Sequence, residues 1–248
     1  MSRTLYGLSV SPWTERARWA LDHHGIAYEY HEHVPMIGEV FLRMKARSTK
    51  ASVPLLADGD QIVMGSFAIV KHAERVGRGA SLFPSGEDDA IAGWVDKAER
   101  MVDVGRAWFM RRMLKDKEAQ AESLPSFVPG GLRSAFAPSA AMAVRFLSYK
   151  YDVPTSVDAL VDETLRPLLH ELRETLDRHR DDVGKTTYIL GPSFTAADLV
   201  LASAMQAITP HERVKLGPAS QKVWSNPKLV DEFGDLVEWR DAIYEKHR

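Results

Sequence analysis

The sequence predicts an α/β unit followed by an all-helical unit. Within the first 79 residues, short runs with strand character alternate with helical periodicity. After residue 87 strand patterns nearly disappear and long amphipathic stretches follow one another. The length of 248 residues also exceeds the usual size of a single domain. We therefore expect one domain over residues 1–79 and a second over residues 87–248, joined by a short linker.

Composition narrows the class of protein. Hydrophobic residues make up 45% and charged residues 27%, so the chain is apolar enough for a core and too apolar for extended disorder. Lys and Arg number 32 against 34 Asp and Glu, a net charge of −2. This balance predicts no bulk attraction to nucleic acid or to an anionic membrane, so a site for polyanions must be local. We expect neither nucleic acid nor membrane as a partner.

The absence of cysteine and of long apolar segments excludes further classes. With 0 Cys, the chain has no disulfide, no Cys-based metal site and no thiol nucleophile of its own. No stretch reaches the roughly 18 apolar residues of a membrane span, and the start lacks a leader pattern. The expected location is the cytoplasm.

The first elements alternate strand and helix. Residues 4–8 predict a strand, and Ser11 is expected to cap a helix over residues 11–24 because Pro12 suits the first helical position. Residues 26–34 alternate apolar and polar side chains as in a strand. A short helix over residues 38–45 is expected to turn three apolar side chains inward: Val40, Phe41 and Met44.

A hairpin and a helix complete the first domain. Residues 53–57 and 61–64 predict two strands around Gly59. Ser66 is expected to cap a helix that Gly77 ends. The predicted order is β-α-β-α-β-β-α.

The second domain is predicted to be helical throughout. A segment at 123–138, with three prolines and Gly-Gly, predicts a long loop of the kind that forms lids or binding loops. The helical candidates are residues 88–115, 139–150, 157–180, 195–208 and 227–246.

Ser11 is the first candidate for chemistry. A hydroxyl at a helix start lies among unpaired N–H groups and the positive end of the helix dipole, which favour an anion such as a thiolate. Thr14 follows Ser11 one helical turn further on. Donation from the hydroxyl to the sulfur of a bound thiol lowers the pKa of that thiol from its reference value of about 8.5. The alternative is an ordinary N-cap that stabilises the helix by about 1 kcal/mol.

Two further segments offer binding groups. A cis bond before Pro54 turns the Val53 backbone outward to pair with a peptide-like ligand in β fashion, although trans is the commoner form. Gly65 and Ser66 present a hydroxyl and N–H groups at a helix start, which suits a carboxylate. Each segment alone is better explained by local structure, whereas the three together are less easily dismissed as a site in the α/β unit.

Other patterns favour structure over chemistry. Thr195 and Asp198 form a capping box, with the Thr195 hydroxyl on a first-turn N–H and Asp198 on the Thr195 N–H, so Asp198 nucleates a helix and does not catalyse. His23, His24, His31 and His33 lack a ligand spacing, so no metal is assigned. The apolar side chains Met101, Trp108, Phe109, Met110 and Met113 fit either a pocket or a core, and the basic run Arg43, Lys45, Arg47 and Lys50 fits either an anion site or a solvated face.

Taken together, the motifs resemble those of the cytosolic glutathione transferases over nearly the whole chain. Their order and spacing carry the resemblance. They are Leu5-Tyr6, the segment from Ser11 to Arg18, Ala20-Leu21, Gly25-Ile26, Val53-Pro54, Ser66, Leu82-Phe83-Pro84 and the segment from Gly191 to Asp198.

The resemblance implies a thioredoxin-like domain that binds glutathione, a helical bundle that binds an electrophile, and a homodimer with a role in detoxification. It implies Ser11 as the catalytic residue, in the register of the omega, zeta and etherase-like classes, whereas Tyr6 falls one residue short of the tyrosine of other classes. Pro54 is expected in cis, with the Val53 backbone on the cysteinyl part and Ser66 on the γ-glutamyl carboxylate. The expected glutathione-binding residues are Ser11, Trp13, Val53, Pro54, Gly65 and Ser66.

Departures from the family pattern leave alternatives. Gly65 stands where most members have Glu, Gln or Asp, so the ligand's α-amino group loses a partner, and the lack of Cys excludes an omega-type thiol transferase. The expected function is a serine-type glutathione transferase that acts on an apolar electrophile without a metal. The alternatives are a GST-like binding or scaffold protein without catalysis and a glutathione-dependent isomerase or dehalogenase.

Overall fold

The computed structural model describes residues 3–125, 128–180 and 187–248. The chain divides into two compact units. Unit 1 comprises Met1–Ala98, Leu172–Ala204 and Glu238–Arg248, and unit 2 comprises Glu99–Glu171 and Met205–Val237.

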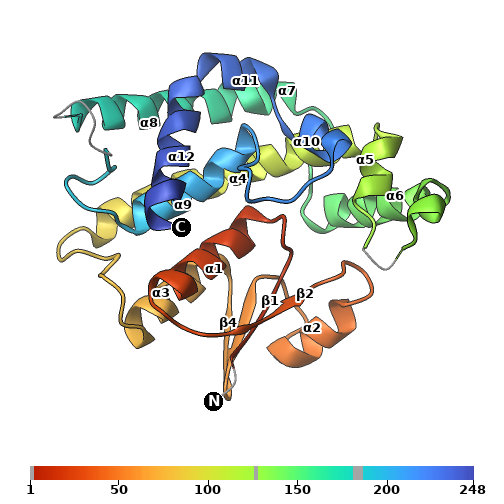
Figure 1. The fold of residues 1–248 in the computed structure, drawn as a ribbon, viewed down its shortest axis with the longest axis horizontal. Helices are drawn as coiled ribbons and strands as arrows, with labels where there is room; N and C mark the ends of the chain where they lie inside the picture. The colour runs from red at the N-terminus through yellow and green to blue at the C-terminus, as the bar shows by residue number, and fades with distance from the viewer. Residues whose placement is uncertain (1–2, 126–127, 181–186) are drawn as a thin grey trace. The chain divides into compact units, whose positions relative to one another are not determined.

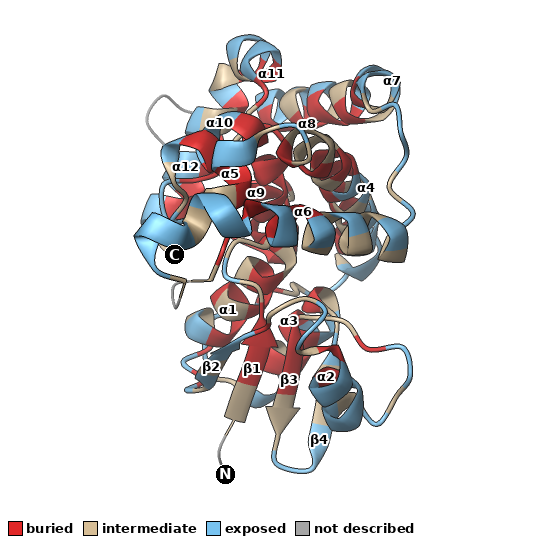
Figure 2. Cartoon of the chain, turned by 90° about the vertical axis from the view of Figure 1, so that its right-hand side faces the viewer, coloured by how far each residue is buried: buried red, intermediate tan, exposed pale blue. Residues whose placement is uncertain are grey.

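Residues 3–76 of unit 1 form a four-stranded mixed sheet with helices on both faces (Figure 1). The strand order is β2-β1-β3-β4, with β1 parallel to β2 and antiparallel to β3. Helices α1 and α3 pack together on one face and α2 lies on the other (Figures 1 and 2). This is the predicted thioredoxin-like arrangement. Its elements are β1 (Arg3–Gly7), α1 (Pro12–His23), β2 (Glu29–Glu32), α2 (Glu39–Ala46), β3 (Leu55–Asp58), β4 (Gln61–Met64) and α3 (Ser66–Val76).

The rest of the described chain is helical, as predicted. The helices are α4 (Asp88–Met113), α5 (Lys117–Glu122), η1 (Gly130–Leu132), α6 (Arg133–Lys150), α7 (Asp158–Leu160), η2 (Val161–Leu165), α8 (Arg166–Arg178), α9 (Ala196–Ala204), η3 (Met205–Ala207), α10 (Pro218–Trp224), α11 (Pro227–Glu232) and α12 (Gly234–His247). None of the helices in the described ranges combines the length and the apolar character that a membrane span requires.

Side-chain alternation along β1 builds two cores on the two faces of the sheet. Tyr6 packs with Leu42 of α2 and with Leu55, its pairing partner on β3. Leu5, the neighbour of Tyr6, therefore points to the other face, where it is fully buried. The buried Arg16 of α1 connects two segments that are far apart in the sequence, because its guanidinium donates to the Ser203 hydroxyl of α9 at 2.8 Å.

The face of α2 that we expected to point inward is the wrong one. Val40 and Met44 are each 66% exposed and Phe41 is also exposed, whereas Leu42 is buried. Glu39 is buried as well and meets the buried His33 ring at 3.4 Å. The short helix carries apolar side chains on both faces, and the sheet takes the face of Leu42.

Two predicted boundaries in the helical part of the chain also need correction. The 123–138 loop is shorter than expected because η1 and α6 begin at Gly130 and Arg133, with Pro138 inside α6; residues 126–127 lie outside the described residues. The single helix expected over 227–246 is two helices that meet at Phe233 and Gly234. The short helices α5 and α10 were not predicted.

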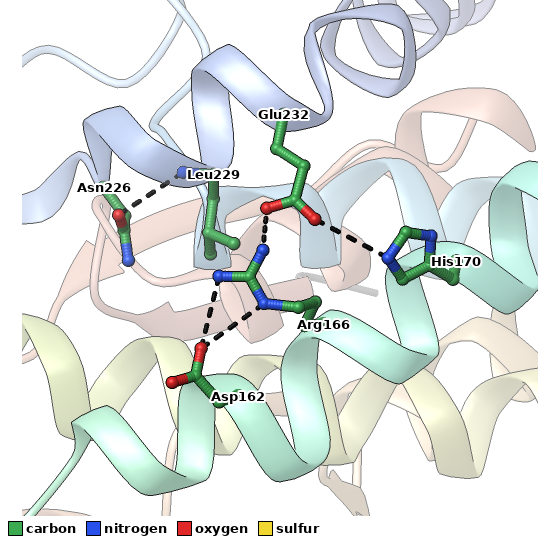
Figure 3. A network of polar contacts seen from close by, with 6 residues as sticks. All are labelled: Asp162, Arg166, His170, Asn226, Leu229 and Glu232. Carbon is green, nitrogen blue, oxygen red and sulfur yellow. Dashed lines mark hydrogen bonds and ion pairs between the residues drawn. The ribbon is translucent and has the colours of Figure 1, made fainter.

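Unit 2 packs apolar side chains inside and ion pairs outside. Met101, Met110 and Met113 are buried, and Phe109 stacks on Trp224 with ring centroids 4.2 Å apart, so packing explains these residues of α4. Figure 3 shows a partly exposed network that joins α8 to α11. In it Arg166 pairs with Asp162 and Glu232, Glu232 also meets His170 at 3.6 Å, and the Asn226 side chain caps α11 at Leu229. Exposed pairs of this kind stabilise by about 1 kcal/mol at most.

Candidate functional site

Three segments of the sequence meet at one end of the sheet. Tyr6 pairs with Leu55, and Leu55 pairs with Met64, so these residues form one row across β1, β3 and β4. Because β3 runs antiparallel to both neighbours, three segments lie at the same end of the sheet. They are the β1–α1 loop after Tyr6, Pro54 before Leu55, and Gly65 after Met64. The backbone N–H of Gly65 donates to the Pro54 carbonyl at 3.0 Å, which joins two of the segments directly.

The β1–α1 loop is held by its own side chains. The Thr14 hydroxyl oxygen accepts from the Leu8 N–H at 3.1 Å, and Thr14 is fully buried. A Cβ on Gly7 would stand only 2.4 Å from Thr14 Cγ2, so this close approach requires glycine. Thr14, which was expected to assist Ser11, instead fixes the loop.

Ser9 and Ser11 differ in what their hydroxyls do. The Ser9 hydroxyl donates to Glu32 at 3.2 Å, and its N–H also donates to that carboxylate. Ser11 is the N-cap of α1, as predicted, and has extended backbone angles, but its side chain makes no capping hydrogen bond. The Ser11 N–H donates to the Leu8 carbonyl at 2.9 Å and its carbonyl accepts from the Glu15 N–H at 3.0 Å. Ser11 is half-buried, and its hydroxyl therefore lies at the amino end of α1 without the capping role that its position allows.

Charges around α1 include one carboxylate in the first turn. Glu15 lies there and is paired with Arg248 at 2.7 Å, and Arg248 also meets Asp22 at 2.6 Å. Although burial lowers the pKa of Arg248, the two carboxylates outweigh it and raise the pKa well above its ordinary value. The carboxylate of Glu15 reduces the positive potential at the amino end of α1, and the charge of Arg248 compensates for it. No sequence signal pairs residues 15 and 248.

The peptide bond between Val53 and Pro54 is cis, as the resemblance implied. Val53 is half-buried and packs against the cluster that contains Tyr6. Proline precedes the first residue of β3, the position at which a strand tolerates its missing N–H. Tyr6 itself lies on β1 and is buried in this cluster, where its ring contacts those of His31 and Phe41, so it does not belong to the loop.

The start of α3 differs from the prediction by one residue. Gly65, and not Ser66, is the N-cap, and Ser66 is the first helical residue and buried. Gly65 has a φ of 97°, a value that residues with a Cβ rarely adopt, although a Cβ there would meet no atom within 4 Å. The first turn of α3 holds no acidic residue, so the dipole at this end is not offset by a local carboxylate.

Asp198 has the structural role that the capping box predicted. Its Oδ2 accepts from the Thr195 N–H at 2.8 Å, and its Oδ1 accepts from the Ile189 N–H at 2.8 Å. The Thr195 hydroxyl, expected on a first-turn N–H, donates to Asp198 Oδ2 instead. Burial raises the pKa of Asp198 to about 6, because desolvation outweighs these hydrogen bonds. Over the ranges that the structure describes, no group of three or more His, Asp and Glu side chains is placed to hold a metal ion.

Comparisons with known proteins agree with this architecture. Residues 5–79 match the family model described as glutathione S-transferase, N-terminal domain. Glutathione transferase GSTFuA2 from Phanerochaete chrysosporium superposes with a TM-score of 0.63 at 18% identity, covering 100% of this chain and 99% of that chain. A possible glutathione S-transferase from Rhodopseudomonas palustris gives 0.61 at 17% identity, covering 99% and 95%.

A third structure similar to this chain contains the tripeptide. A glutathione S-transferase from Methylobacillus flagellatus with glutathione bound gives a TM-score of 0.57 at 14% identity, covering 98% of this chain and 94% of that chain. No curated protein matches the sequence. The chain thus combines a thioredoxin-like domain with a helical domain. More particularly, it has the fold of the glutathione transferases, and residues 5–79 match the N-terminal domain of that family.

Proposed function

We propose that this protein is a serine-type glutathione transferase in which Ser11 activates the glutathione thiol. The observation that carries the proposal is the Ser11 hydroxyl, which lies at the amino end of α1 and makes no capping hydrogen bond. Donation from this hydroxyl and from the helix N-terminus stabilises a thiolate over a thiol. Each unit by which the thiol pKa falls represents about 1.4 kcal/mol of that preference.

The three segments at the end of the sheet form the proposed cradle. The Val53 backbone pairs with the cysteinyl residue of glutathione beside Pro54, and Trp13 flanks it on α1. The γ-glutamyl carboxylate lies at the start of α3 against Gly65 and Ser66, where the first turn has no acidic residue. The row of Tyr6, Leu55 and Met64 supports this arrangement because it brings the segments to one sheet end.

The proposed reaction is attack by the thiolate sulfur on an apolar electrophile. In substitution the sulfur–carbon bond forms as the leaving group departs with its electron pair, and the thiol proton passes to solvent. Addition and ether cleavage use the same nucleophile. Holding both reactants together contributes through proximity, and hydroxyl donation adds a few kcal/mol at most. A cytoplasmic homodimer that detoxifies electrophiles is part of this proposal, and light scattering tests the dimer.

The test is an ultraviolet titration of the thiolate of bound glutathione. We expect the wild type to show thiolate near neutral pH and Ser11→Ala to titrate closer to free glutathione. Ser9→Ala is the matched control, because Ser9 belongs to the same loop and its hydroxyl is bound to Glu32. An unchanged titration in Ser11→Ala would rule out this serine as the activator.

A second candidate is a glutathione-transferase-like binding or scaffold protein without catalysis. Gly65 favours it, because this residue has no side chain to bind the α-amino group of glutathione. Calorimetric titration with glutathione separates the two functions, since a catalytic site requires measurable binding and a scaffold does not. Screening halides, aryl ethers and maleyl compounds then separates a transferase from an isomerase or dehalogenase that uses the same thiol.

A further inference from the structure

The helix α2 and its flanks expose apolar side chains along one stretch of unit 1. Ile37 is 79% exposed, and Val40 and Met44 are each 66% exposed. Met36 and Phe41 are exposed as well. Single exposed apolar residues are ordinary, but a contiguous group marks a surface that a partner or ligand covers. Figure 2 shows α2 coloured as exposed over most of its length.

The same stretch carries positive charge that no local carboxylate offsets. Arg43, Lys45, Arg47 and Lys50 are all exposed, and none of them forms an ion pair with a residue that the structure describes. Glu39 is the only acidic residue between positions 33 and 57, and it is buried against His33. We call the exposed side chains of Ile37, Val40, Arg43, Met44, Lys45 and Arg47 the α2 surface.

A shallow hollow, wide open to solvent, lies on this surface. Its lining is mainly apolar, and Val40, Met44, Arg43 and Arg47 all border it. The exposed side chains of the α2 surface therefore offer contacts to apolar chains and to anionic oxygens within one small area. This combination is typical of helices that lie in a lipid–water interface, where apolar residues enter the acyl boundary and Lys and Arg meet headgroups.

We propose that the α2 surface docks on an anionic lipid membrane. Charge complementarity decides the occupant. A second copy that used this face symmetrically would place the three cations of one chain against the same three of the other, which is unfavourable. An anionic bilayer satisfies both parts of the surface, because headgroup phosphates pair with the cations while the apolar side chains leave water.

This proposal changes the expectation that net charge gave. The charge of −2 averages over 248 residues, and it predicted no bulk attraction to membranes. Screening reduces the influence of distant charges beyond about 10 Å at ordinary ionic strength, so the local surface decides contact. The proposal does not depend on glutathione binding, and its test uses the protein without glutathione.

The experiment is co-sedimentation with vesicles of phosphatidylcholine alone or mixed with phosphatidylglycerol. We expect binding to the mixed vesicles at low salt, release at high salt, and little binding to phosphatidylcholine alone. Each Lys or Arg near an anionic surface raises the partition coefficient about fivefold, so Arg43→Gln with Arg47→Gln should lower it about 25-fold. The variant Ile37→Ser, Val40→Ser and Met44→Ser should bind at least tenfold more weakly, because it loses the inserted apolar area.

A matched control removes exposed apolar side chains elsewhere. Phe136 and Met142 lie exposed on α6, and Phe136→Ser with Met142→Ser should bind as the wild type does. Absence of binding to the mixed vesicles at low salt overturns the proposal, as does binding that neither α2 variant weakens. A dimer in light scattering that the Ile37, Val40 and Met44 variant abolishes would assign the surface to a second copy and overturn it too.

Discussion

Two helices of unit 1, α1 and α9, follow directly on a hydroxyl residue, and they use it in opposite ways. At α9 the third helical residue is Asp198, whose carboxylate accepts from the Thr195 N–H and from the Thr195 hydroxyl. At α1 the third helical residue is Thr14, whose hydroxyl oxygen accepts from the Leu8 N–H, and the Ser11 N–H goes to the Leu8 carbonyl. The Ser11 side chain is left without a capping bond.

The comparison indicates that the residue three positions on decides whether the hydroxyl residue at a helix start takes part in capping. A carboxylate there completes a capping box and engages the hydroxyl residue. At α1 the loop satisfies the same backbone groups without the serine hydroxyl, which stays available to a ligand. We therefore expect substitutions at α1 to change activity and substitutions at α9 to change stability.

The largest expected effect is on turnover in Ser11→Ala. Loss of the hydroxyl that stabilises the thiolate should lower kcat/KM with a general aromatic halide by roughly one to three powers of ten. The free energy of unfolding should change by less than about 0.5 kcal/mol, because the hydroxyl makes no capping bond. Steady-state kinetics and urea unfolding measure the two quantities. If the variant keeps wild-type turnover, or loses about 2 kcal/mol of stability, Ser11 has a structural role at the start of α1 like that of Thr195 and Asp198 at α9.

The next largest effect is on the stability of Asp198→Asn. We expect its free energy of unfolding to fall by about 2–3 kcal/mol at about pH 4. The reason is that an amide oxygen cannot replace all the contacts that Asp198 makes with Thr195 and Ile189. Burial raises the pKa of Asp198 to about 6, so between about pH 4 and 6 the folded state retains a proton that the unfolded state has released. The contribution of Asp198 thus falls as pH rises through this window, and the difference between wild type and variant narrows.

Urea unfolding of both proteins at several pH values between about 4 and 7 checks this prediction. Leu199→Ala is unsuited as a control because Leu199 is fully buried, whereas Asp60→Asn changes an exposed carboxylate in the β3–β4 turn. The control should show no such narrowing. A difference that widens as pH rises through the same window would contradict the raised pKa.

A third helix start sharpens the comparison with the opposite dependence on pH. The Glu122 carboxylate accepts from the N–H groups of Ala219 and Ser220 at 3.1 and 2.7 Å, at the start of α10. Burial raises its pKa, but these donors outweigh burial and lower the pKa below its ordinary value. Glu122→Gln should cost about 1 kcal/mol at neutral pH, a value reduced by partial solvent exposure.

The stabilisation from Glu122 is present above its unfolded pKa and is lost as pH falls through its lowered folded pKa. Wild type and Glu122→Gln should therefore converge in acid, whereas wild type and Asp198→Asn diverge there. Thermal unfolding in parallel buffers compares the two pairs. Convergence of both pairs in acid would show that folding lowers the pKa of both carboxylates, and would contradict the opposite shifts.

Local signals account for the parts of the fold and site that the sequence predicted correctly. Ser11 and Pro12 start α1, Gly59 turns the hairpin, and Asp198 lies three residues after Thr195, so each depends on neighbours in the chain. The features that the sequence did not predict depend on distant residues or on which face of a helix turns toward the sheet. A helix of 8 residues with apolar side chains all round does not reveal which face the sheet takes, and Val40 and Met44 prove to be exposed.

The candidate site shows the same division. Its three segments were each predicted from local patterns, and strand pairing brings them to one end of the sheet. The N-cap of α3 is Gly65 and not the predicted Ser66. Gly65 has a φ of 97°, with which the helix begins one residue earlier than expected. No pattern in the sequence specifies this backbone angle. The Arg248 contact with Glu15 joins residues 233 positions apart and has no local signature.

The smallest expected effect tests that distant contact. Glu15 lies in the first turn of α1 with Arg248 as its partner at 2.7 Å. In Arg248→Gln the uncompensated carboxylate should raise the pKa of the bound thiol by a fraction of a unit, equivalent to about 0.3–1 kcal/mol. Stability should also fall by about 1 kcal/mol, since Arg248 binds Asp22 as well.

A double variant separates the two effects of Arg248. Glu15→Gln in the Arg248→Gln background removes the negative charge near the thiol, so the thiol pKa should return to the wild-type value. Stability should not return, because the contact between Arg248 and Asp22 is still missing. Ultraviolet titration of bound glutathione and urea unfolding measure the two quantities on the same samples. If stability and thiol pKa recover together, Arg248 acts by holding α1 in place; if only the pKa recovers, it acts through the charge of Glu15.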